Sequence, residues 1–100
     1  METEEVLRLR LNHETSQITW TCLERFFAQG RTRLVDSKLD LVEVGVQIIL
    51  DNKKLIEQWV KSGALRTISD HTAKQWINEN TLVWSVVVRP WVLVQPVNTK

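Results

Sequence analysis

The stretch LVWSVVVRPWVLVQP, residues 82–96, decides the fold, because it is the most apolar part of the chain and consists mainly of strand-forming residues. Successive side chains of a strand point to opposite faces, so residues 82–88 place two mostly apolar rows back to back. Pro90 has no N–H group and is tolerated only at an edge, a bulge or the start of a strand. The stretch therefore predicts two strands, 82–88 and 91–95, with a bend at Arg89-Pro90.

The bend also predicts a contact surface. The connection is shorter than that of a usual hairpin, so we expect the second strand to continue the first beyond a kink or to reach another chain. Residues 82–95 exceed the usual strand length of about 5–6 residues, which favours packing against a second chain. The bend turns part of the second strand toward the helices and keeps Arg89 in water. The predicted interface residues are Trp84, Arg89, Pro90, Trp91 and Leu93.

The N-terminal part of the chain predicts two helices. Thr3 suits the start of the first, because two glutamates follow it in the first turn. The apolar stripe of this helix is formed by Val6, Leu7, Leu11 and Ile18. Residues 19–30 predict the second helix, in which Thr21 and Glu24 fit a capping box and Gly30 fits the left-handed position after the last turn.

Residues 39–63 are open to two interpretations. Residues 39–50 alternate often enough for a strand and contain many β-branched side chains, which disfavour a helix. However, one continuous apolar face at helical spacing runs through the whole segment, with polar residues opposite. We favour a helix that starts after Ser37, is interrupted near Asp51-Asn52 and ends at Gly63.

Two short strands and one further helix complete the pattern. Residues 31–36 and 64–68 predict strands, and residues 69–80 predict a helix with Ser69 as its N-cap. This order is typical of an α+β fold, here a small sheet of three to four strands packed against four to five helices. We expect a single domain at residues 1–96 and a disordered tail at residues 97–100.

Composition bounds the function. The chain has 100 residues and a formal net charge of +1 with both signs interspersed, which gives no basic face for tight binding of nucleic acid or membranes. Cys22 is the single cysteine, so an internal disulfide and a cysteine-based zinc site are excluded. No apolar segment reaches the roughly 20 residues of a membrane-spanning helix. The N-terminus lacks the pattern of a secretory signal, and a cytoplasmic location is expected.

Three pieces of the chain are distinctive. They are LNHETSQITW, with Asn12, Glu14 and Trp20, then LDLVEV after Asp36, and PWVLVQ near the end. In these LNxET, LDLVEV and PWVLVQ motifs the chain resembles a family of small bacterial proteins, from proteobacteria and cyanobacteria, that is known as a domain of unknown function. The chain departs from that family at Cys22, where an acidic residue is usual, and at Ser37, where proline is common. The resemblance implies a bacterial, cytoplasmic protein and no particular activity.

These features favour a non-enzymatic protein that acts through protein–protein contact or as a homodimer, with no cofactor. One alternative is a nucleic-acid-binding accessory module, because arginines beside exposed tryptophans can hold single strands. Its candidate residues are Arg31, Arg33, Arg66 and Arg89. The balanced charge argues against it, as does the place of Trp59 and Trp76 on apolar helix faces.

A second alternative is a divalent-metal-dependent activity at Asp36, Asp40 and Glu43, because carboxylate oxygens suit Mg²⁺. Helix caps and a solvent-exposed face account for the same residues more simply, so no metal site is predicted. Neither histidine is expected to take part in chemistry, and Cys22 is interpreted as an inert helix thiol. Glycine-rich nucleotide-binding loops are absent from the sequence.

Overall fold

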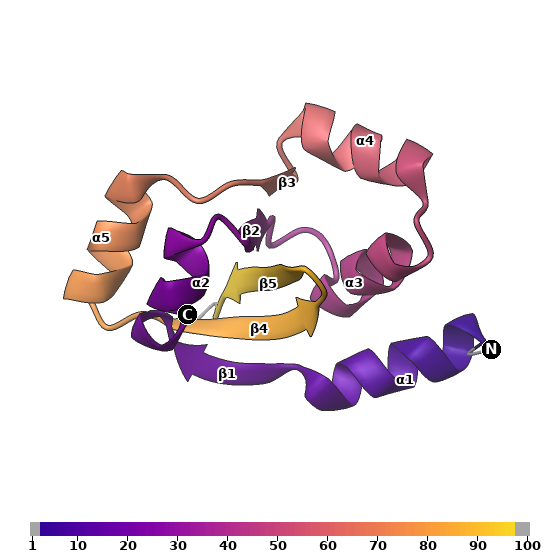
Figure 1. Cartoon of the computed structure of the whole chain (residues 1–100), viewed down its shortest axis with the longest axis horizontal. Helices are drawn as coiled ribbons and strands as arrows, with labels where there is room; N and C mark the ends of the chain where they lie inside the picture. Colours follow the sequence, from indigo (N-terminus) through magenta and orange to yellow (C-terminus); the bar gives the residue numbers. More distant parts are fainter. Residues whose placement is uncertain (1–2, 98–100) are drawn as a thin grey trace.

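The chain folds around one sheet (Figure 1), and a computed structural model describes residues 3–97. In chain order the elements are α1 (Glu4–Glu14), β1 (Ser16–Thr19), the 3₁₀ helix η1 (Trp20–Leu23), α2 (Glu24–Ala28), β2 (Thr32–Val35), α3 (Leu41–Ile49), α4 (Lys53–Ser62), β3 (Leu65–Arg66), α5 (Asp70–Asn78), β4 (Leu82–Val88) and β5 (Trp91–Pro96). Apart from Val97, the predicted tail at 97–100 lies outside the described residues. None of the described helices is long and apolar enough to cross a membrane.

The sheet within residues 3–97 has five strands in the order β1-β4-β5-β2-β3. β2 and β5 are parallel, and the other neighbouring pairs are antiparallel. The predicted α+β class is therefore confirmed, but the strand count is higher than predicted. The strand that the sequence pattern missed is β1.

The apolar stretch at residues 82–96 forms a hairpin. Val88 pairs with Trp91, so β4 turns directly into β5 through Arg89 and Pro90, whose peptide bond is cis. The two predicted strands are confirmed, but the prediction that the second continues the first or reaches another chain is wrong. Because the strands pair with each other, the length of the apolar stretch does not require a second chain.

The segment between α1 and β2 also differs from the prediction. Residues 16–19 pair with β4, and the Trp20 N–H donates to the Thr81 carbonyl at 2.9 Å. The predicted capping box does not form, since no side chain caps η1 or α2. Trp20 is completely buried, with its ring against those of Phe27 and Trp76, and this tertiary gain outweighs the local preference for one longer helix.

The ambiguous central segment is helical, as favoured, and its interruption lies where it was expected. Asp51 has a positive φ of 57°, and Asn52 accepts a hydrogen bond from the Leu55 N–H and so caps α4. Gly63 ends α4 in the left-handed conformation with φ of 81°. The predicted start is wrong by a few residues, because Asp40 rather than Ser37 caps α3.

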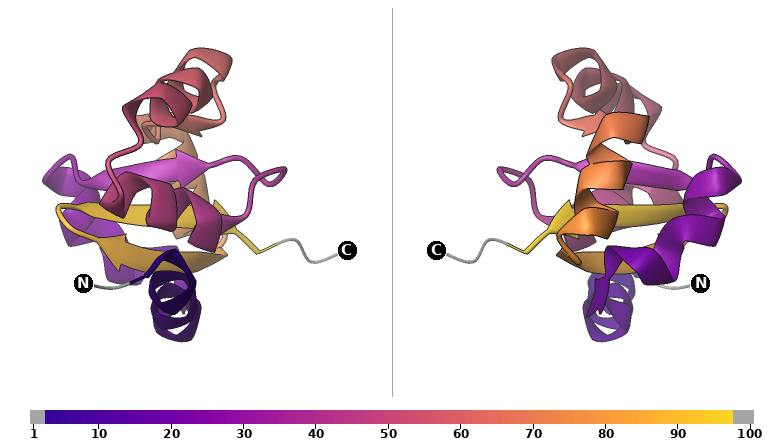
Figure 2. Two further views of the ribbon diagram at one scale, coloured as in Figure 1. Left: turned by 90° about the vertical axis from the view of Figure 1, so that its right-hand side faces the viewer. Right: turned by 90° about the vertical axis from the view of Figure 1, so that its left-hand side faces the viewer.

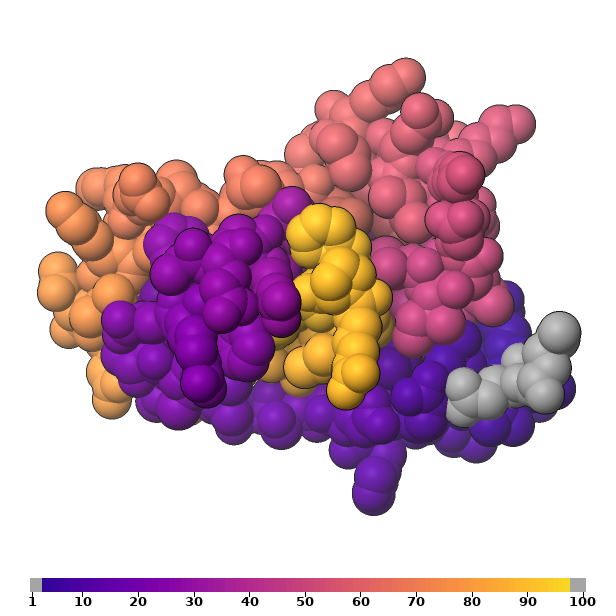
Figure 3. Space-filling model, in the orientation of Figure 1, coloured from indigo at the N-terminus to yellow at the C-terminus, as the bar shows by residue number. Residues whose placement is uncertain are grey.

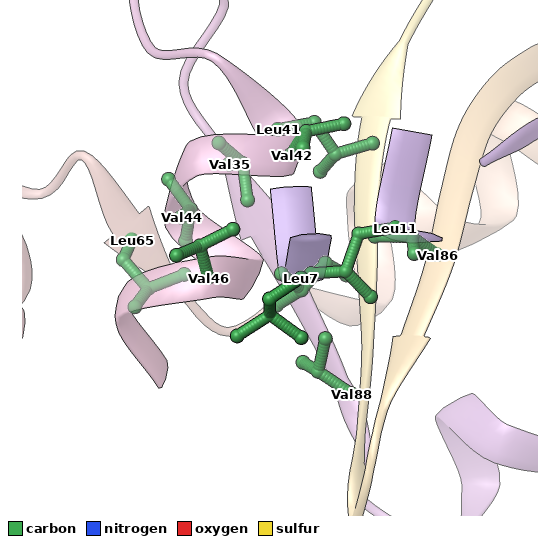
Figure 4. Packing of buried hydrophobic residues seen from close by; sticks show 11 residues of the cluster. Leu7, Leu11, Val35, Leu41, Val42, Val44, Val46, Leu65, Val86 and Val88 are labelled. Atoms are coloured by element: carbon green, nitrogen blue, oxygen red, sulfur yellow. The ribbon is translucent and has the colours of Figure 1, made fainter. Parts of the chain in front are cut away.

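The two faces of the sheet pack against different helices. Figure 2 shows α1, α3 and α4 together at one side of the molecule and α2 and α5 together at the other. The first cluster (Figure 4) consists of Leu7, Leu11, Val35, Leu41, Val42, Val44, Val46, Leu65, Val86, Val88 and Leu93. The second consists of Trp20, Leu23, Leu34, Ile68, Ala73, Trp76, Val83, Val92 and Val94.

α3 lies close to both α1 and the sheet because residue 45 is glycine. A Cβ atom at Gly45 would lie 3.0 Å from Leu11 Cδ1 and 3.2 Å from Val88 Cγ1. Both distances are shorter than ordinary van der Waals contact between carbons, about 3.5–4.0 Å. α3 is therefore held tightly at its middle, and its C-terminal end reaches the tip of the β4–β5 hairpin.

Candidate functional site

A half-open hollow is lined by residues from the β4–β5 hairpin tip, β2, β3, α4 and the end of α3. Its volume is about 480 Å³. We call it the arginine-rimmed hollow, and its lining residues are Arg33, Ile48, Asp51, Ile56, Val60, Leu65, Arg66, Thr67, Arg89, Pro90 and Trp91. Apolar side chains thus form most of the wall, and three arginines contribute positive charge.

Arg33 is fixed at one side of the hollow. Its guanidinium carbon lies 4.2 Å from the centre of the Trp91 ring, a cation–π arrangement. Its Nη1 donates to the carbonyl oxygens of Gly30 at 3.0 Å and Thr32 at 2.7 Å. Arg33 points to the same face of β2 as buried Val35, so its stem packs on the sheet while the charged group reaches the hollow.

The other two arginines are exposed. Arg66 Nη1 donates to the Gly63 carbonyl at 2.6 Å, which holds this side chain near the end of α4. Arg89 occupies the tip of the β4–β5 hairpin. Within residues 3–97, none of the three arginines has a carboxylate oxygen within 4.0 Å of its guanidinium group. Their charge is therefore available to a ligand.

The opposite wall is formed by α4, which projects from the body of the molecule next to β3 (Figure 3). None of the α4 residues is buried, although Ile56 and Trp59 pack against the first cluster. Val60 lines the hollow with 56% of its surface exposed. Asp51 is the acidic member of the lining, and its Oδ2 lies 4.0 Å from Lys53 Nζ. The hollow thus combines a basic side with an apolar side.

This arrangement suits the binding of a charged ligand with an apolar part. Histidine and cysteine are absent from the lining of the hollow within the described chain. Charged groups at the rim can form charge-assisted hydrogen bonds to a carboxylate or a phosphate. The apolar wall can remove an aliphatic or aromatic group from water. A ligand that uses both features is an organic anion.

The predicted interface residues fall into separate places. Arg89, Pro90 and Trp91 come together in the hollow. Trp84 lies further along β4, where 37% of its surface is exposed. Leu93 has no exposed surface and belongs to the first cluster, so its assignment to an interface is wrong. The reason is that β5 is the central strand and both of its faces are covered.

The three carboxylates considered for a metal have other partners. Asp40 Oδ1 accepts from the backbone N–H groups of Val42 at 2.9 Å and Glu43 at 3.4 Å. Asp36 Oδ1 lies 3.5 Å from the Ser37 hydroxyl. Within residues 3–97, no three histidine, cysteine or acidic side chains are gathered so that they could hold a metal ion. The described structure therefore does not bring Asp36, Asp40 and Glu43 together as a set of metal ligands.

Glu43 instead joins α1 to α3. Arg8 Nη2 donates to Glu43 Oε2 at 2.6 Å, and Gln47 Nε2 donates to Glu43 Oε1 at 2.9 Å. The Gln47 amide and the Arg8 guanidinium hold the pKa of the Glu43 carboxyl below its ordinary value, because both stabilise the ionised form. Asn52 Nδ2 donates to Gln47 Oε1 at 3.0 Å, so this network also reaches the start of α4.

Three of the four arginines proposed for nucleic acid line the hollow, but one face of the tryptophan beside them is covered. Arg33 covers a face of the Trp91 ring, and Trp91 also packs against the first cluster. A nucleobase would have to displace Arg33 in order to stack there. The residues that sequence reasoning missed are Ile48, Ile56 and Val60, whose only signal was the apolar face of their helices.

The chain is thus a small α+β protein with helices on both faces of one mixed sheet. The chain belongs to the family described as Protein of unknown function (DUF2288), whose model matches residues 6–96. It is also similar to the NMR solution structure of PA1075 from Pseudomonas aeruginosa, with 33% identity and a TM-score of 0.80 over 99% of this chain and 89% of that chain. No curated protein matches. The family resemblance expected from the motifs is confirmed, and the function of the family is unknown.

Proposed function

We propose that this protein is a non-enzymatic binding module that holds an organic anion in the arginine-rimmed hollow. The observation that carries the proposal is the meeting of three arginines without carboxylate partners at one apolar concavity. No ion pair within the described chain uses these three charges, so each guanidinium group can form charge-assisted hydrogen bonds to a bound anion.

The size of the hollow supports the same ligand class. A volume of about 480 Å³ lies within the range of small-molecule sites, roughly 300–1,000 Å³. The hydrogen bonds of Arg33 and Arg66 to backbone carbonyls hold both guanidinium groups in place before a ligand arrives. Such preorganisation lowers the entropic cost of binding. We therefore expect a carboxylate or phosphate attached to an apolar body.

The proposal is tested by NMR titration of the ¹⁵N-labelled protein with phenyl phosphate, benzoate and benzyl alcohol. We expect both anions to shift the backbone amide signals of Arg89 and Trp91 and the indole N–H signal of Trp91. The affinity of the neutral alcohol should be at least about tenfold lower, because it forms no charge-assisted hydrogen bond. Equal binding of the alcohol, or shifts that map away from the hollow, would contradict the proposal.

Matched variants separate the hollow from the rest of the surface. Arg66→Gln and Arg89→Gln should each weaken phenyl phosphate binding about fivefold to tenfold, since each removes one cationic donor. Arg25→Gln is the control, because Arg25 lies on α2, among the elements that pack against the opposite face of the sheet. An equal loss in the control would mean that net charge, and not this site, governs binding.

The homodimer stays a prediction, since nothing in a single chain tests it. The sequence feature that favours it is the long apolar stretch, and this stretch pairs within the chain. The mass of the protein by analytical ultracentrifugation checks it directly. A dimer that dissociates on addition of phenyl phosphate would place the hollow at the interface between copies.

A further inference from the structure

A second hollow adjoins the first at the hairpin tip. Its volume is about 510 Å³, and its lining residues are Arg10, Glu14, Ile49, Val87, Val88 and Arg89. Arg89 lines both hollows, and the neighbouring residues Ile48 and Ile49 at the end of α3 line one each. The two hollows therefore lie on either side of one arginine.

Exposed apolar side chains occur on both sides of Arg89. Val60 is exposed in the first hollow, whereas Ile49 and Val87 are 41% and 53% exposed in the second. The far end of the second hollow carries little free charge, because Arg10 Nη1 lies 3.8 Å from Glu14 Oε2. Val60 on one side and Ile49 and Val87 on the other thus flank Arg89, and the Arg10–Glu14 pair lies at the far end of the second hollow.

We propose that the ligand of this surface is a short, extended acidic peptide segment of a partner protein. A carboxylate of the segment meets Arg89, and an apolar side chain enters the hollow on each side. This inference rests on the proposed function and extends it. Each hollow alone is large enough for a small molecule, so a ligand that occupies both is longer than a single small anion. An extended chain spaces its side chains along a surface, as a compact anion does not. Arg33 and Arg66 provide further charge complementarity for the acidic residues.

The test uses the blocked peptide acetyl-Phe-Asp-Glu-Asp-Leu-amide as the probe, with NMR detection. We expect it to shift the signals of Ile49 and Val87 as well as those of Val60 and Trp91, and to bind at least about tenfold more tightly than benzoate, since it buries more apolar surface. Two control peptides replace either the three acidic residues by Asn, Gln and Asn, or the two apolar ends by serine. Each control should bind about tenfold more weakly than the probe.

A variant pair locates the second hollow. Val87→Ser should weaken the probe about threefold to fivefold and leave benzoate unchanged, because the proposed function assigns benzoate to the first hollow and Val87 lines only the second. Val6→Ser is the matched control, since Val6 is 50% exposed on α1 and lines neither hollow. Both substitutions are at exposed positions, so the variants are expected to fold, and thermal unfolding checks that they do.

The outcomes distinguish the two proposals. If benzoate binds the first hollow but the probe binds no more tightly and leaves Ile49 and Val87 unshifted, the peptide inference is overturned and the proposed function stands. If neither binds, both are overturned. Tighter binding of a thymidine oligonucleotide than of the probe at physiological salt would also overturn the peptide inference in favour of nucleic acid. Shifts in both hollows that the Val87 variant selectively weakens would support it.

Discussion

Arginines in two regions of the molecule have different partners. Arg8 on α1 donates to Glu43 at the start of α3 at 2.6 Å and to Glu4 at 3.4 Å, so its charge is used within the protein. Arg66 and Arg89 near the other end of α3 donate to a carbonyl or project into water, and neither meets a carboxylate among residues 3–97. The same side chain thus holds helices together in one region and stays available to a ligand in the other.

The difference teaches that residue type alone does not mark a binding site. What marks it is the pairing of each charge, together with the shape of the surface around it. Since α3 carries Glu43 at one end and Ile48 and Ile49 at the other, its position governs both regions. Four substitutions test how far the two regions are independent.

The largest expected effect comes from Gly45→Val, which should break both regions at once. The added carbons would meet Leu11 and Val88, both fully buried, and overpacking of this kind costs about 1–3 kcal/mol of folding stability. Urea unfolding measures the loss. Phenyl phosphate binding should weaken in the same variant, because α3 would move relative to the hairpin tip.

The control for this variant is Gln58→Val on the exposed side of α4, which measures the cost of a β-branched residue in a helix without a steric clash. An unchanged unfolding midpoint in Gly45→Val would mean that Leu11 and Val88 move aside freely. The close approach of α3 would then not set the geometry of the hollow.

A smaller effect is expected from Glu43→Gln, which should weaken the contact between α1 and α3 and leave the arginine-rimmed hollow unchanged. The pKa of Glu43 is lowered in the folded chain, so its contribution to stability is fully present above the pKa of glutamate in the unfolded chain, about 4.3. The contribution is lost as the pH falls from there through the lower pKa of the folded state. Because Glu43 is more than one-third exposed, we expect its charge to contribute less than about 1 kcal/mol to the free energy of unfolding at neutral pH.

Unfolding of the wild type and Glu43→Gln over a range of pH checks this expectation. The difference in the free energy of unfolding between the two proteins should shrink in acid and disappear below the folded-state pKa. A difference that stays constant from neutral pH into strong acid would show that the Glu43 charge does not contribute. Phenyl phosphate affinity at neutral pH should be the same in both proteins.

The smallest effect on stability is expected from Arg66→Gln and Arg89→Gln, which change the arginine-rimmed hollow and not the contact between α1 and α3. Exposed positions without ion pairs usually change the free energy of unfolding by less than about 0.5 kcal/mol. These two variants should therefore unfold like the wild type while they lose anion affinity. A loss of stability as large as that of Glu43→Gln would mean that these arginines serve the fold.

Several elements could be predicted because their signals are local. Ser69 accepts from the Thr72 N–H as a helix N-cap, and Gly63 adopts the left-handed conformation that ends α4. The interruption near Asp51 was visible because polar residues break the apolar face there. β1 could not be predicted, since Ser16–Thr19 has little apolar character and is a strand only through its pairing with β4.

The candidate site was only partly visible. Arg89, Pro90 and Trp91 were selected as a surface because proline and arginine interrupt an apolar run. Arg33 and Arg66 had been considered for nucleic acid, but nothing in the sequence placed them beside that run. The parallel pairing of β2 with β5 and the position of α4 bring these residues together, and both depend on contacts between distant segments.

The sequence by itself determined the class of fold, the family and most of the helix ends, because periodicity, caps and turn residues act over a few neighbouring positions. Only the tertiary structure decided that β4 and β5 form a hairpin, that Leu93 is buried, and that three arginines surround one hollow. The physical reason is that strand pairing and the burial of apolar surface are settled between segments far apart in the chain. Whether an arginine finds a carboxylate or stays available to a ligand follows from that arrangement.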